Sequence, residues 1–264
     1  MTVTILDTSY DNDRTGIYLY NHKIVHLPES IGSLSNLETL DLCNDELNCL
    51  PESISKLSKL KRLVLSGNQL ISLPESISKL TNLIYVSLHN NQLTVLPESF
   101  GDLINLLILH LEYNQLISLP ESIGKLVNLE YLWLEGNKLT SLPESIGELV
   151  NLKKVCLNNN ELENLPESIS KLVKLEELWL LDNKLRNIPA SILNIKKSLF
   201  INVSTYEINN LQTNTEFLIF SWLGQELTNL PTGLKEIWIN KEYEKFNHKL
   251  PFGCVIKHYD KFLY

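Results

Sequence analysis

Apolar and polar residues follow one another along this chain in a unit that repeats every 23 residues. Between residues 119 and 141 the unit reads LPESIGKLVNLEYLWLEGNKLTS, and the next copy begins at residue 142 without an insertion. The Leu-Pro-Glu-Ser start of the unit occurs at Leu27, Leu50, Leu73, Leu96, Leu119, Leu142 and Leu165. A fixed period of this length predicts a stack of similar units, in which each unit contacts only its neighbours.

Each unit is predicted to contain one short strand and one short helical turn. Leu132 and Leu134 flank Trp133, and this alternation predicts a strand with one buried face. Ile123 and Leu126 are three residues apart, which suits a helical turn that faces the same core. The proline fits the first turn of that helix, and the glutamate after it favours the positive end of the helix. The expected fold is an α/β solenoid, curved and right-handed, with a parallel β-sheet on its concave face and short helices on its convex face.

One column of the repeat holds asparagine, and this column has a structural interpretation. The chain turns inward just after the strand there, which leaves backbone groups without partners in the sheet. An amide can both donate and accept, so it can satisfy those groups and bridge to the next repeat. His22, Asp45, Tyr206 and Gln225 hold the equivalent places at the two ends, which suggests a different turn in the end repeats. The asparagines expected to form this ladder are Asn68, Asn91, Asn114, Asn137, Asn160 and Asn183.

The unit also carries a family resemblance. Leu129, Leu132, Leu134, Asn137 and Leu139 give the pattern LxxLxLxxNxL. With this pattern the chain resembles the leucine-rich repeat proteins over about residues 14–203. The 23-residue form LPxxIxxLxxLxxLxLxxNxLxx looks like the intracellular, Ras-group-associated class. The resemblance implies a scaffold that binds a protein partner, with a small GTPase or its regulator as the implied partner class.

The repeat pattern divides the chain into three parts. Residues 1–13 are expected to form an N-terminal cap, in which residues 2–6 add a strand over the open end of the sheet and residues 7–13 form a polar turn. Residues 14–205 hold the 23-residue repeats. Residues 206–264 are expected to form shorter, degenerate repeats and an aromatic C-terminal cap. The segment 230–251 resembles FNIP repeats, which are known from amoebae and from large DNA viruses that infect them.

Composition and charge limit the classes of partner that this chain is expected to bind. The formal net charge of −8 argues against nucleic acid and anionic membranes as main partners. No apolar run approaches the roughly 20 residues that span a bilayer, and no secretory signal is visible at the N-terminus. The scattered cysteines Cys43, Cys49, Cys156 and Cys254 favour reduced thiols. We therefore expect a cytoplasmic monomer, in the host cytoplasm if the source is viral, with no cofactor.

The sequence contains no catalytic motif that would predict an enzyme. A glycine-rich phosphate loop, an HExxH motif and a GxSxG motif are all absent. His22 and His26 are four residues apart but in a non-helical stretch, which disfavours a metal site. The repeated glutamate after each proline is interpreted as a helix-start preference, with a cation site as the alternative. The alternative function is a substrate-recognition arm of an effector-type or ubiquitin-ligase-like system that acts with a separate catalytic protein.

Function is therefore expected on the outward positions of the strands, which line the concave face. Blocks of alternating charge with exposed aromatic residues suit a protein partner, because tyrosine and tryptophan dominate the energy of many interfaces. The alternative is that these rings serve cross-strand packing within the sheet. The residues expected to contact the partner are Tyr85, His110, Tyr113, Tyr131, Trp133, Lys153, Lys154, Glu177 and Trp179.

Overall fold

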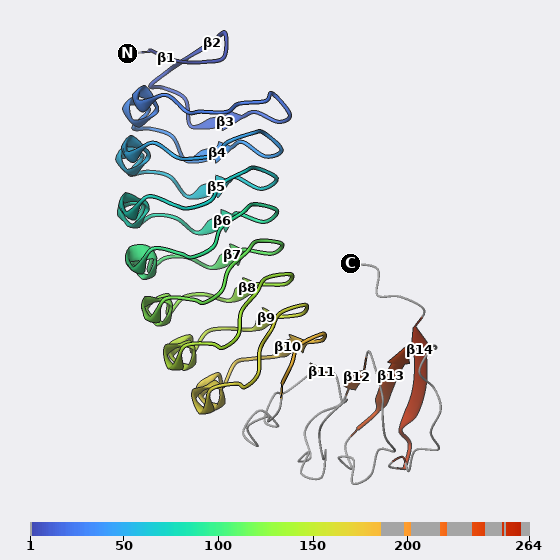
Figure 1. Ribbon diagram of the computed structural model, residues 1–264. Coiled ribbons are helices and arrows are strands. Elements are labelled where there is room, and N and C mark those ends of the chain that lie inside the picture. Colours follow the sequence, from blue (N-terminus) through green and yellow to red (C-terminus); the bar gives the residue numbers. More distant parts are fainter. Residues whose placement is uncertain are drawn as a thin grey trace.

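The computed structural model describes residues 2–185, 198–201, 217–220, 234–240, 250 and 252–259. In this part of the chain, short strands alternate with short 3-10 helices, and successive coils stack into a curved column (Figure 1). The helices line one side of the column and the strands line the concave side. The predicted α/β solenoid is thus confirmed, with a parallel sheet on one face and helices on the other.

Twelve described strands form one parallel sheet, and their order in space follows their order in the chain. From β3 to β10, paired residues are 23 positions apart, so each repeat adds one strand in the same register. The strands of these repeats are β3 (Gly16–Tyr18), β4 (Thr39–Asp41), β5 (Arg62–Val64), β6 (Tyr85–Ser87), β7 (Ile108–His110), β8 (Tyr131–Trp133), β9 (Lys154–Cys156) and β10 (Glu177–Leu180).

The core lies between the sheet and the helices and is built from columns of leucine and isoleucine. Leu109 and Leu132 are paired across β7 and β8, and both are fully buried. Ile123 and Leu126 from the helical side are also fully buried. Because equivalent residues stack in every repeat, the apolar contacts form one continuous cluster along the column.

The helical segments are 3-10 helices of five residues each. They are η1 (Glu29–Ser33), η2 (Glu52–Lys56), η3 (Glu75–Lys79), η4 (Glu98–Asp102), η5 (Glu121–Lys125), η6 (Glu144–Glu148) and η7 (Glu167–Lys171). The proline lies just before each helix in extended backbone, with φ −67° and ψ 151° at Pro120, and not inside the first turn as expected. Its carbonyl oxygen accepts the first helical hydrogen bond, from the Ile123 N–H at 3.0 Å. A proline there has no N–H of its own that would need a partner at the start of such a short helix.

The asparagine column lies inside the stack of coils and bridges consecutive repeats. The Asn137 Oδ1 accepts a hydrogen bond from the Leu116 N–H at 3.0 Å. Its Nδ2 donates to the carbonyl oxygens of Leu111 at 2.9 Å and Leu134 at 3.0 Å. Asn68, Asn91, Asn114, Asn160 and Asn183 make the same contacts in their own repeats. Each amide therefore joins backbone groups of two repeats that have no partner in the sheet.

Asp45 occupies the next place in the asparagine column and makes only the acceptor part of its hydrogen bonds. Its Oδ1 accepts hydrogen bonds from the His22 N–H at 2.8 Å and the Ile24 N–H at 3.2 Å. Its Oδ2 is buried and has no hydrogen-bond partner in the described part of the chain. The carboxylate accepts as an asparagine would but cannot donate, so the column does not stop at Asn68. Tyr206 and Gln225, the corresponding residues at the other end, lie outside the described residues.

A second row of asparagines, in the turns before the strands, joins the repeats near their surface. The Asn105 Nδ2 donates to the Thr81 carbonyl oxygen at 2.8 Å, and the Asn128 Nδ2 donates to the Ile104 carbonyl oxygen at 2.8 Å. Equivalent bonds are made by Asn36, Asn82 and Asn151. These side chains satisfy carbonyl groups in the turns that precede each strand. Two asparagine rows, one buried and one exposed, therefore fix the spacing of the coils.

The fourth position of the seven described 3-10 helices is glycine in four of them and serine in three. A Cβ at Gly101 would lie 2.0 Å from the Ser122 carbonyl oxygen of the next helix, so glycine permits an approach that serine would block. After a serine the hydroxyl of the next helix is satisfied, as when the Ser99 Oγ donates to the Glu75 carbonyl oxygen at 2.9 Å. After a glycine, the serine hydroxyl of the next helix has no hydrogen-bond partner among the described residues. These hydroxyls belong to Ser53, Ser122, Ser145 and Ser168.

The N-terminal segment differs from its expected form. β1 (Thr2–Ile5) pairs antiparallel with β2 (Thr8–Asp11) in a separate two-stranded sheet, and it does not extend the main sheet. The expected polar turn at residues 7–13 is therefore mostly strand. The hairpin closes at Leu6, whose φ is 54°, and it places Val3 and Ile5 over the first repeats as part of the core. Pairing with β2 satisfies backbone hydrogen bonds of β1. The apolar face of β1 still covers the N-terminal end of the stacked coils.

Four described strands continue the sheet beyond β10. They are β11 (Ser198–Ile201), β12 (Phe217–Phe220), β13 (Glu236–Asn240) and β14 (Val255–Tyr259). Paired residues from β11 to β14 are 19 positions apart, so the shorter spacing expected at this end is present in the sheet register. Most of the aromatic cap expected in residues 206–264 lies outside the described residues. Within the described part, Phe252 is fully exposed and Trp238 is half-buried.

Candidate functional site

Each repeat presents three outward positions on the concave face, at alternate residues. The first row runs through Arg62, Tyr85, Ile108, Tyr131, Lys154 and Glu177. The second row runs through Val64, Ser87, His110, Trp133, Cys156 and Trp179. Backbone pairing continues beyond the strands, with the Tyr113 N–H donating to the Glu135 carbonyl oxygen at 2.7 Å. This extension creates a third outward row, in which Glu112 and Glu135 are neighbours.

An aromatic patch, defined here as Tyr85, His110, Tyr113, Tyr131 and Trp133, occupies the middle of this face. The His110 ring stacks on the Trp133 ring, with centroids 5.9 Å apart and planes 2° apart. The Tyr85 ring is 5.6 Å from that of His110, and His89 meets His110 edge-on at 6.2 Å. The Arg62 guanidinium covers the other end of the group, 3.8 Å from the Tyr85 ring centroid. Side chains from four successive strands are thus in contact.

Ion pairs border the patch toward the C-terminal repeats. The Lys153 Nζ lies 2.6 Å from the Glu130 Oε2 and 6.0 Å from the Tyr131 ring centroid. The hydrogen bond to Glu130 raises the pKa of the Lys153 ammonium above its usual value. The Lys154 Nζ lies 2.8 Å from the Glu177 Oε1, and the Trp179 Nε1 donates to the Glu177 Oε2 at 3.3 Å. Lys153, Lys154 and Glu177 therefore form a polar rim beside the rings.

Cys156 separates Trp133 from Trp179 in the second outward row. Its side chain is buried, and burial raises the pKa of the thiol to about 12. The Sγ donates toward the Glu135 Oε2 at 3.8 Å. A protonated, buried thiol is a poor nucleophile, so Cys156 fills space between the two indole rings.

Two glutamates of the third outward row were not among the predicted site residues. The His110 Nδ1 is 2.8 Å from the Glu112 Oε1, and the Glu112 Oε2 is buried without a hydrogen-bond partner in the described part. Glu135 is only 7 % exposed, and its Oε1 accepts a hydrogen bond from the Tyr113 hydroxyl at 2.9 Å. Alternation continued two residues past the strand would have placed both side chains on the same face as His110 and Trp133.

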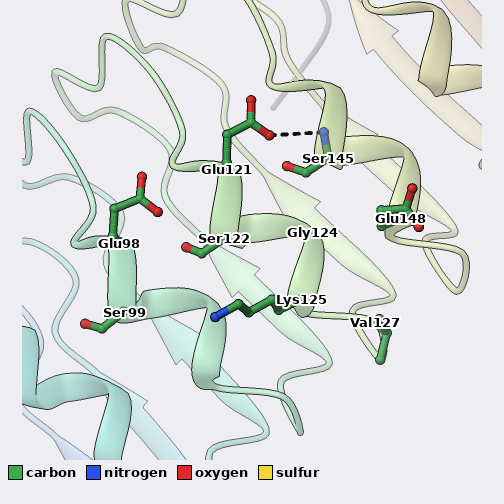
Figure 2. A pocket seen from close by; sticks show the side chains of 9 residues that line it. All are labelled: Glu98, Ser99, Glu121, Ser122, Gly124, Lys125, Val127, Ser145 and Glu148. Atoms are coloured by element: carbon green, nitrogen blue, oxygen red, sulfur yellow. Dashed lines mark hydrogen bonds between the residues drawn. The ribbon is translucent and has the colours of Figure 1, made fainter.

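The glutamate row on the convex side has a structural role. The Glu121 carboxylate accepts a hydrogen bond from the Ser145 N–H at 3.4 Å, in the helix of the next repeat (Figure 2). Glu29 makes the same contact with the Ser53 N–H at 3.3 Å. These contacts stabilise the start of the helix in the next repeat, whereas the sequence led us to expect a role at the start of the glutamate's own helix. The shallow groove of Figure 2 is lined by this row and by Lys125, whose ammonium pairs with Asp102 at 2.9 Å.

The described residues do not suggest a cofactor or metal centre. Within them, no group of three or more His, Cys, Asp and Glu side chains is placed to hold a metal ion. None of the described helices has the length and apolar character needed to cross a membrane. The described side chains of the concave face are rings, ion pairs and buried carboxylates.

The model of the leucine-rich repeat region matches residues 17–88 and 98–198, and a single leucine-rich repeat model matches residues 82–103. The chain belongs to the leucine-rich repeat family. This result agrees with the stacked coils and with the asparagine ladder already described. Among curated proteins, the sequence has no significant match.

Solved structures of leucine-rich repeat proteins are similar to this chain along most of its length. A leucine-rich repeat protein of Leptospira interrogans is 30 % identical over 93 % of this chain and 74 % of that one, with a TM-score of 0.61. An internalin, inlF, of Listeria monocytogenes is 19 % identical over 89 % of this chain and 79 % of its own, with a TM-score of 0.71. The plant peptide hormone receptor RGFR1, in complex with RGF2, is 26 % identical with a TM-score of 0.67; 93 % of this chain matches 45 % of the receptor.

Proposed function

We propose that this leucine-rich repeat protein is a non-enzymatic scaffold that holds a protein partner on the concave face of its sheet. The observation that carries this proposal is the aromatic patch, in which Tyr85, His110 and Trp133 from three successive strands contact one another. The ion pairs of Lys153 and Lys154 border it. Half-buried rings beside a polar rim are the usual composition of the part of an interface that supplies most binding energy.

The proposal includes a partner class. The 23-residue form of the repeat resembles the Ras-group class, so a small GTPase or its regulator is the first partner to test. The similar fold of the plant receptor, which was solved in complex with RGF2, supports a protein or peptide ligand in general. The acidic balance of the chain, with a formal net charge of −8, favours a partner with a basic surface.

The test begins with affinity capture from cells of the source organism and continues with binding measurements on the captured protein. Trp133→Ala combined with Trp179→Ala should weaken binding by at least about 2 kcal/mol, because both indoles lie on the outward face of the sheet. Reversal of Lys153 and Lys154 to glutamate should mainly slow association and change its salt dependence. Binding and thermal melting are measured on the same preparations.

The matched control is Val150→Ala with Val173→Ala, two exposed apolar residues that lie outside the concave rows. This variant should bind as the wild type does. A folding control is Leu132→Ala, which removes a fully buried side chain and should lower stability far more than the tryptophan variant does. If the tryptophan variant captures the partner normally, the binding site lies elsewhere on the molecule.

A further inference from the structure

Tyr113 has a backbone conformation that its side chain does not favour. Its φ is 52°, in the left-handed region that non-glycine residues rarely adopt. The same position in the other described repeats holds residues that tolerate this region, namely Asn21, Asn44, Gly67, Asn90, Gly136, Asn159 and Asp182. Tyr113 is thus the one aromatic residue of this row within the described repeats. Strain of this kind persists only when the surroundings enforce it, and it often marks a functional position.

The surroundings of Tyr113 hold its ring on the concave face. The hydroxyl donates to the Glu135 Oε1 at 2.9 Å. Part of the ring lies against Gly136, where a Cβ would come within 2.6 Å of the tyrosine Cδ1, so glycine at that position makes room for the ring. The Tyr113 residue remains 47 % exposed. A rigid, accessible ring therefore stands between Gly136 and solvent and is backed by the Glu135 carboxylate.

Within the described residues, no lysine or arginine pairs with the carboxylates behind this ring. Elsewhere on the concave face, Glu38, Glu130 and Glu177 each pair with a lysine. Among the described residues, Glu112 has only His110 as a possible cationic partner, and Glu135 has none. Both carboxylates are mostly buried, where a charge without a counter-ion is costly. A cation supplied by the partner would restore the balance.

We propose that Tyr113 is the seat of an arginine side chain from the partner, with its guanidinium over the tyrosine ring and next to Glu112 and Glu135. This inference rests on the proposed function, since it names the chemistry of the segment that the concave face holds. The chain already shows the arrangement internally, where the Arg62 guanidinium lies 3.8 Å from the Tyr85 ring centroid. Arginine suits the site better than lysine because its planar group stacks on rings and hydrogen-bonds to carboxylates at its edge. Its methylene stem can cover apolar surface at the edge of the tyrosine ring.

The test uses N-acetyl-arginine amide as the probe and ¹⁹F NMR of protein labelled with 3-fluorotyrosine. The Tyr113 resonance is identified by its absence from the Tyr113→Phe variant. The probe should shift this resonance saturably, and the neutral isostere N-acetyl-citrulline amide should bind about fivefold more weakly or less well still. Glu112→Gln with Glu135→Gln should weaken the arginine shift by a similar factor. The matched control, Glu98→Gln with Glu144→Gln on the convex side, removes the same charge and should leave the shift unchanged.

Tyr113→Asn distinguishes recognition from a structural role. Asparagine occupies this row at Asn90 and Asn159, so the substitution relieves the backbone strain and deletes the ring. The variant should melt within about 3 °C of the wild type, although it should lose the partner's affinity. An equal response to arginine and citrulline, or an arginine response only at other tyrosines, would overturn the inference. If partner capture requires Trp133 but is indifferent to Tyr113→Asn, the arginine seat is wrong and the proposed function stands. If capture is indifferent to both, the proposed function fails as well.

Discussion

At the scale of single residues, the solenoid depends on a few polar side chains in an apolar interior. Leucines supply most of the buried surface, but they cannot pair the backbone groups that each inward turn leaves open. The Asn137 side chain satisfies three such groups with bonds of 2.9 to 3.0 Å. The contribution of this amide to stability is therefore specific to its chemistry, and a side chain of similar bulk cannot replace it.

Asn137→Leu keeps approximately the same volume and removes the amide. Buried backbone groups in two repeats would lose their partners, so the free energy of unfolding should fall by at least about 1–3 kcal/mol. Urea denaturation of the variant beside Lys138→Ala, an exposed neighbour, measures the difference. Equal transition midpoints for the two variants would show that the ladder does not contribute to stability.

Asp45→Asn should act in the opposite direction. The carboxylate already accepts two backbone hydrogen bonds, but its Oδ2 is buried without a partner. An amide keeps the acceptor and adds the donor that the other members of the column use. We expect a gain of about 0.5–1.5 kcal/mol at neutral pH, seen as a higher melting temperature. A lower melting temperature would mean that the charge of Asp45 itself stabilises the first repeats.

Cys156 should be unreactive in the folded protein because burial raises the pKa of its thiol from 9.0 to about 12. Alkylation with iodoacetamide at pH 8, read by peptide mass spectrometry, should modify the exposed Cys49 and leave Cys156 intact. The folded state binds this proton more tightly than the unfolded state does. The contribution of Cys156 to stability is therefore complete below about pH 9 and decreases as the pH rises toward 12. Rapid labelling of native Cys156 would contradict its burial on the concave face.

At the scale of elements, the sequence predicts best what depends on periodicity alone. The buried positions of Leu109 and Leu132 follow from alternation and from the 23-residue step, and both side chains are fully buried. The stacking of His110 on Trp133 does not follow from periodicity, because ring contacts depend on rotamers that no pattern encodes. The pairing of β1 with β2 was missed for a related reason. A tight turn at Leu6 competes with the open sheet edge for the same strand.

The spacing of the 3-10 helices gives a prediction at this scale. Gly101→Ala would place a Cβ 2.0 Å from the Ser122 carbonyl oxygen, so η4 and η5 would have to separate. The expected destabilisation is about 1–3 kcal/mol by chemical denaturation. Ser78→Ala is the matched control, because that position of η3 already carries a Cβ, and it should stay within about 0.5 kcal/mol. Similar losses in both variants would show that the glycine is not needed for the close approach.

At the scale of the whole molecule, each coil is stabilised mainly by its two neighbours. Such a column responds locally to damage, since a defect at one end need not reach the middle. The N-terminal hairpin covers one end with Val3 and Ile5, both of which belong to the continuous core. The two ends of a solenoid therefore set where unfolding begins.

Val3→Asp places a charge where the side chain is fully buried, so the hairpin should detach from the first repeats. Hydrogen exchange followed by mass spectrometry should show lost protection at β3 and β4, with β8 and β9 unchanged. The conservative variant Val3→Ile should keep the protection of all four strands. A uniform loss along the column would indicate that the repeats unfold as one cooperative unit.

The uninterrupted 23-residue register also fixes the distance at which outward side chains recur along the concave face. Neighbouring strands of a sheet are about 4.8 Å apart, whereas an extended chain advances about 3.3 Å per residue. The two lengths coincide at about 10 Å, where three residues of an extended segment span two repeats. Tyr131 and Glu177 are related by such a step in the first outward row, and Trp133 and Trp179 in the second. An extended ligand that runs along the stack of coils would therefore present every third side chain to an equivalent position of the sheet. A ligand whose contacting side chains recur at another interval would lose this match within a few coils.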